Sequence, residues 1–183
     1  MNNIEKENIF TDNKEKSTQY VEEVDISTQT DENEERMTPS TTLINSMAML
    51  ANRFLHSSYW FLSLGLVFSS HSLPNLKHNC MWRQSITRDS AKRIISLIMT
   101  MDSHLLVDVA RPSLDVTDCT VVQAVGDIRD LDRWLLDSLR EVVMVAREEG
   151  EKIGLEVLEQ IMEEQKILLN ESSKMNSLTF IHM

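Results

Sequence analysis

The sequence has few residues that make tight turns: four glycines and three prolines among 183 residues. All-β folds need such residues at the ends of many short strands. The shortage therefore argues against an all-β protein and fits long helices joined by few turns. We predict a mainly α fold, a small bundle of three to five helices that follows a disordered acidic N-terminal tail.

Cysteine is also scarce, since the chain has only Cys80 and Cys119. Two such residues form no disulfide framework, and their scarcity is typical of a reducing compartment. The first residues show no signal-peptide pattern, so we expect a cytoplasmic protein. His71, His78 and Cys80 match no standard zinc spacing and have no evident fourth ligand, which leads us to predict no metal and no cofactor.

Basic residues are in deficit, with 18 Lys and Arg against 29 Asp and Glu, for a net charge of −11. Proteins that bind phosphate backbones need a basic surface, so we expect no nucleic-acid partner. The sequence contains no phosphate loop, dinucleotide fingerprint or nucleophile elbow. Its five histidines are scattered, and none can be paired with a nucleophile. We therefore predict no catalytic residues and a protein that is not an enzyme.

Long apolar runs are absent. The longest one, residues 59–68, is about ten residues, short of the ~20 that a spanning helix needs. We expect a buried core helix here, and membrane association is not favoured. The alternative is a membrane-associated protein anchored through residues 54–68, with this segment lying at the bilayer surface.

What the N-terminal 41 residues do contain is mostly acidic and polar, which predicts disorder. Within them, one short stretch resembles the Thr-Gln-Thr linear motif that binds the homodimeric dynein light chain. Its residues are Ser27, Thr28, Gln29, Thr30 and Asp31. A second, partial match comprises Ser17, Thr18 and Gln19, followed by Tyr20 where the motif has threonine.

The resemblance implies that this stretch adds a strand to a sheet edge of the light chain, with Gln29 as the central specificity residue. The two grooves of that hub would hold two copies of the chain side by side, as a homodimer. The resulting prediction is a non-enzymatic adaptor or scaffold, cytoplasmic and cytoskeleton-associated, that binds another partner through its helical region.

Helical periodicity divides the rest of the chain. Residues 42–70 form an apolar helical segment, 71–86 a linker broken at Pro74 and Asn75, 87–169 a helical region and 170–183 a C-terminal tail. Pro112 is expected to end the first helix of the 87–169 region. Gly150 and Gly154 indicate a kink or a break. The strongest apolar stripe consists of Val121, Ala124, Val125, Ile128, Leu131, Leu135, Leu139, Val142 and Ala146.

One further resemblance lies at the start of this stripe. Val122, Gly126 and Asp127 are spaced as in the pro-apoptotic helix that docks into Bcl-family grooves, although Arg129 stands where that family has an apolar residue. A pro-apoptotic-helix-type regulator is therefore another alternative. The three tryptophans, Trp60, Trp82 and Trp134, are predicted to be core or interface anchors.

Overall fold

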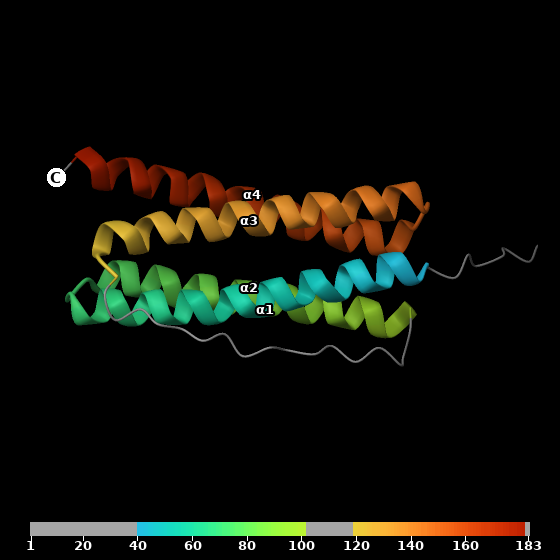
Figure 1. Ribbon diagram of the computed structural model, residues 1–183, viewed down its shortest axis with the longest axis horizontal. Helices are drawn as coiled ribbons and strands as arrows, with labels where there is room; N and C mark the ends of the chain where they lie inside the picture. Colours follow the sequence, from blue (N-terminus) through green and yellow to red (C-terminus); the bar gives the residue numbers. More distant parts are fainter. Residues whose placement is uncertain (1–39, 102–118, 182–183) are drawn as a thin grey trace, which may run out of the picture. The chain divides into compact units, whose positions relative to one another are not determined.

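A computed structural model describes residues 40–101 and 119–181 (Figure 1). In these ranges the regular structure is four α-helices. They are α1 (Thr41–Ser70), α2 (Pro74–Met101), α3 (Val121–Glu148) and α4 (Lys152–Ile181). The prediction of a mainly α helical bundle is confirmed. The acidic tail with its two motif matches, and Pro112, lie outside the described residues.

The helices begin and end at local sequence signals. The hydroxyl of Ser40 caps α1 by accepting a hydrogen bond from the Leu43 N–H at 3.2 Å, and Thr120 with Gln123 forms a capping box at α3. Between α3 and α4, Gly150 has φ +70°, a conformation that suits glycine. The break predicted at Gly150 is confirmed, whereas Gly154 lies inside the first turn of α4.

Two predicted boundaries differ from the structure. The linker was expected to extend to residue 86, but α2 already begins at Pro74. Proline is well suited to a first helical position, because the N–H that it lacks would have no intrahelical partner there. The expected tail after residue 170 is instead the last part of α4, in which Ser172 and Asn176 are buried.

The four helices pack so that each has two neighbours. α1 packs against α2 and α3, and α4 packs against α3 and α2. Within these helices α2 and α3 are therefore diagonal partners. The backbone N–H of Ser40, at the start of α1, donates to Glu149 at the end of α3 at 3.2 Å. α1 is thus antiparallel to α3 as well as to α2, and α2 and α3 run in the same direction (Figure 1).

α1 is the most apolar of these helices, and Arg53 is its only Asp, Glu, Lys or Arg. Its inner side is packed in the bundle, where Phe54, Phe61, Leu64 and Phe68 are fully buried. The inner side of residues 54–68 therefore belongs to the core, which corrects the alternative of a membrane anchor, while Tyr59 and Leu66 are exposed. Across the described helices, none combines the length and apolarity required to cross a bilayer.

Candidate functional site

The bundle interior contains two hydrophobic clusters, one toward each end, with a group of buried polar residues between them. One hydrophobic cluster includes Phe54, Ile94 and Leu139, and a second includes Phe61, Phe68 and Ile128. On α1, α2 and α3, every buried residue between the two clusters is polar. We call these residues, together with the buried Gln165 of α4, the polar layer. Its residues are Ser57, Ser58, Arg83, Thr87, Ser90, Asp132 and Gln165.

Arg83 of α2 is the centre of the polar layer. Its side chain is 0% exposed, and its Nη1 donates to Oδ2 of Asp132 on α3 at 2.5 Å. This ion pair crosses the bundle between the diagonal helices. Nε of Arg83 donates to Oδ1 of Asn79 at 2.8 Å, and Nη2 donates to the main-chain oxygen of Leu168 at 3.2 Å. Nη2 also lies 3.7 Å from Oε2 of Glu171. A single guanidinium thus connects α2, α3 and α4.

Asp132 has a second partner on α4. Nε2 of Gln165 donates to Oδ1 of Asp132 at 3.2 Å and to its main-chain oxygen at 3.1 Å. Burial raises the pKa of the Asp132 carboxyl, and the positive charge of Arg83 opposes that shift. An isolated charge in this interior would be very unfavourable, so the side chains of Arg83 and Asp132 depend on each other.

Two buried hydroxyls of the polar layer have no protein hydrogen-bond partner, Ser57 Oγ on α1 and Thr87 Oγ1 on α2. Gly65 of α1 lies beside Cys80 of α2, because a Cβ added at Gly65 would be 3.5 Å from Cβ of Cys80. This contact gives the antiparallel register of the two helices. This register brings residue 57 level with residues 87 and 88. The two hydroxyls therefore lie at one level of the interior, where buried polar groups commonly bind internal water.

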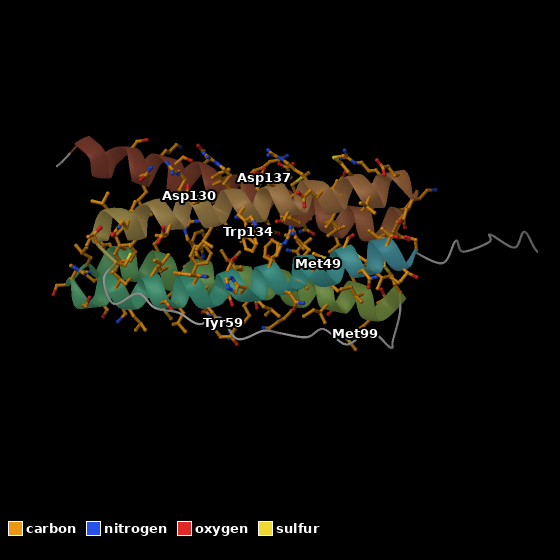
Figure 2. All side chains as sticks on the ribbon, in the orientation of Figure 1. Met49, Tyr59, Met99, Asp130, Trp134 and Asp137 are labelled. Atoms are coloured by element: carbon orange, nitrogen blue, oxygen red, sulfur yellow. The ribbon has the colours of Figure 1, made fainter. Side chains whose placement is uncertain are left out.

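A second group of interacting polar side chains lies between α1 and α3, nearer the surface. The guanidinium of Arg53 lies 5.6 Å from the centroid of the Trp134 ring, and Nη1 donates to Ser138 Oγ at 2.8 Å. The ring of His56 meets the same tryptophan edge-on. Figure 2 shows Trp134 between the ribbons of α3 and α1. Trp82 and Trp134 are more than 40% exposed, so these two are not core residues.

The residues first considered for zinc are not brought together as a site. His71 and His78 are exposed, and Cys80 is buried. Burial raises the pKa of the Cys80 thiol to about 12, which keeps it protonated and a poor ligand. Among the residues that the structure describes, no three His, Cys, Asp or Glu side chains are grouped to hold a metal ion.

Comparison with known proteins identifies the fold. No family model matches the sequence, and no curated protein matches it. Among solved structures, the chain resembles an open-pore ferritin from the hyperthermophilic archaeon Archaeoglobus fulgidus. The TM-score is 0.69 at 14% identity, over 79% of this chain and 87% of that chain. The architecture is therefore that of a ferritin-like four-helix bundle.

Ferritin-like bundles that hold two iron ions use a characteristic set of inward-facing ligands: glutamate from two helices and Glu-x-x-His from each of the other two. This sequence contains no Glu-x-x-His at all. The only buried acidic residue in the described helices is Asp132, and it is paired with an arginine. The residues of the polar layer do not fit a di-metal centre.

The ferritin-like fold also corrects the predicted function. We expected a cytoskeletal adaptor that binds the dynein light chain and carries a separate helical binding region, and that prediction is wrong. The segment from Val122 to Asp127, considered as a pro-apoptotic helix, is the first part of α3, and Ala124 and Val125 within it are fully buried. The linear-motif resemblance at Ser17–Gln19 and Ser27–Asp31 lies outside the described residues and stays a prediction.

Sequence reasoning did not single out the polar layer. A signal for it exists, because three polar residues each interrupt an apolar helix face. Asp132 falls between Ile128 and Leu135, and Gln165 falls between Ile161 and Leu168. On α2, Arg83 follows Cys80 and precedes the polar Thr87, and the apolar face resumes at Ala91. Each is three or four residues from its neighbours on that face, a spacing that points it inward.

Proposed function

We propose that this chain is a non-catalytic structural subunit of the ferritin-like class, with an internal ion pair in place of a metal centre. The observation that carries the proposal is the fully buried guanidinium of Arg83, which is paired with Asp132 across the diagonal of the bundle. A di-metal centre needs several carboxylates free to bind positive ions. Among residues 40–101 and 119–181, the one buried carboxylate is already neutralised by a side chain of the same protein.

A structural subunit also needs a surface for association, and the outer side of α1 supports this role. Asn45, Tyr59 and Leu66 are exposed and are separated by multiples of seven residues, so they lie near one side of the helix. None of them is charged, and Tyr59 and Leu66 are 42% and 61% exposed. With a net charge of −11, two copies repel each other elsewhere, so a charge-free face favours association with a second copy.

Iron oxidation tests the non-catalytic part of the proposal. Ferrous iron is added in air to the purified full-length chain, to a ferritin with a di-iron centre and to protein-free buffer. We expect the chain to match the buffer, because the helices that the structure describes carry no set of ligands that would bring two iron ions together. Saturable oxidation faster than in buffer would show that the chain is an enzyme and would overturn the proposal.

Sedimentation velocity tests the association. Wild-type protein should form larger species as its concentration rises, whereas Leu66→Glu should remain monomeric because it places a charge on the line of contact. Lys92→Glu is the matched control, since Lys92 is an exposed residue of α2. Wild-type protein that stays monomeric at all concentrations contradicts the structural role.

A further inference from the structure

Four oxygen atoms surround the guanidinium of Arg83. They are Oδ1 of Asn79 at 2.8 Å, Oδ2 of Asp132 at 2.5 Å, the main-chain oxygen of Leu168 at 3.2 Å and Oε2 of Glu171 at 3.7 Å. We call this set the oxygen cradle. It draws on three helices, so its geometry is fixed by the packing of the bundle and not by one flexible loop.

The chemistry of the oxygen cradle is that of a cation site. Two carboxylates, an amide oxygen and a main-chain carbonyl are the ligand types that hard cations such as Mg²⁺ and Ca²⁺ accept in proteins. A guanidinium presents only donors, so it satisfies these acceptors without adding one of its own. The cradle has no imidazole or thiolate, and its ligands therefore differ in kind from those of a ferritin-type di-iron centre.

We propose that the oxygen cradle is a cation-binding site whose resident occupant is the guanidinium of Arg83, and that removing this side chain opens the site to a small exogenous cation. The proposal deepens the proposed function, because it states what supplies the positive charge in the bundle interior. The exogenous cation is either methylguanidinium, which has the same charged group as the lost side chain, or a hard divalent metal ion to which the same oxygens can act as ligands.

The oxygen cradle is nearest to solvent on its α4 side. Arg83 and Asp132 are 0% exposed, whereas the side chain of Glu171 is 48% exposed. Glu171 therefore lies at the rim, and we expect truncation of the arginine to open a route past it by which a cation reaches the interior. In the wild-type protein the guanidinium blocks this route, so added cations should have no effect on the site.

The experiment measures the thermal stability of Arg83→Ala by circular dichroism, after purification with a chelator. Melting is followed with no addition, with methylguanidinium, and with Mg²⁺ or Mn²⁺. We expect a much lower Tm than wild type, because Asp132 loses its partner. At least one of the added cations should restore half or more of the lost Tm in a saturable manner, and neither should shift wild-type Tm by a comparable amount.

A matched control is Arg93→Ala. Arg93 also joins α2 to α4, since its Nη1 donates to both carboxylate oxygens of Glu164 at 2.8 and 3.0 Å, but its side chain is one-third exposed. It has no enclosed cradle, so no cation should rescue that variant. Rescue should also be lost in Arg83→Ala/Asp132→Ala, which removes the central ligand.

Arg83→Gln covers the case in which Arg83→Ala does not fold. It shortens the side chain and removes its charge, while its amide can still donate to one oxygen of the cradle. Cation-induced folding of either variant counts as rescue. Absence of rescue in both variants, or equal rescue of Arg93→Ala, would overturn the proposal. Such a failure leaves the iron-oxidation result for the wild-type chain unaffected, so the two proposals fail separately.

Discussion

Replacing Arg83 alone should strongly destabilise the protein, whereas replacing Arg83 together with Asp132 should leave its stability close to that of wild type. Arg83→Met leaves the Asp132 carboxylate buried without its cation, and breaking a buried ion pair in this way costs about 3–5 kcal/mol. For a chain of this size the loss corresponds to a fall in Tm of roughly 6–20 °C. Arg83→Met/Asp132→Leu removes both charges and replaces them with apolar groups of similar volume.

The surroundings predict that the double variant recovers. Gln165 keeps the main-chain oxygen of Asp132 as an acceptor. Glu171 is half exposed and Asn79 is partly exposed, so water can satisfy both. The free energy of unfolding of the double variant should therefore lie within about 1 kcal/mol of wild type, or above it. Urea unfolding followed by circular dichroism gives the four values of the double-mutant cycle. Additive losses from the two substitutions would refute the idea that the two charges depend on each other.

Three further predictions concern the two faces of α3, the protonation of Asp132 and the turn between α3 and α4. Leu135→Asp, at a fully buried position, should lower the unfolding free energy by several kcal/mol. Asp137→Ala, on the exposed side of α3 (Figure 2), should change it by less than about 0.5 kcal/mol. Equal melting shifts would contradict this assignment of the α3 faces. Because burial raises the folded-state pKa of Asp132 above its unfolded value, the native state binds more protons at pH values between the two, so the stability of wild type relative to Asp132→Asn should increase as the pH falls through that interval. Urea midpoints of both proteins over a pH series check the sign, and a decrease would show it to be wrong. Gly150→Ala places a Cβ at φ +70° and should lower the free energy of unfolding by about 1 kcal/mol, which is followed as a fall in Tm. Gly150→Asn should lower it less, because asparagine tolerates this conformation better. An alanine variant with unchanged Tm would mean that the turn relaxes.

Much of the fold could be predicted because its apolar stripes are local. The stripe from Val121 to Ala146 predicted the buried face of α3, and Gly150 predicted the break after it. The start of α2 was missed because its inward face is polar there. Arg83 and Thr87 stand where an apolar residue would have continued the periodicity back toward Pro74.

The polar layer could not be assembled from sequence alone for a different reason. Asp132 is 49 residues from Arg83, and Gln165 is a further 33 residues away. Helical spacing shows that each of them points inward, but not which helices are neighbours or which turns lie at one level. Those facts come from packing, since α2 and α3 are diagonal in the bundle. Arginine and aspartate on inward faces are nevertheless rare enough to predict that each has a buried partner.

The position of the ion pair also determines how the helices can slide along one another. Apolar contacts are not directional, so in a purely hydrophobic interior only the fit of side-chain shapes would oppose displacement of one helix by a turn. A shift of α3 by one turn would bring Ile128 or Leu135 level with the guanidinium and leave Arg83 buried without a carboxylate. Such a displaced packing is strongly disfavoured. We therefore expect the ion pair of Arg83 and Asp132 to specify the register of α3 relative to α2. Replacement of both residues by apolar ones should yield a bundle that is stable but populates more than one helix register.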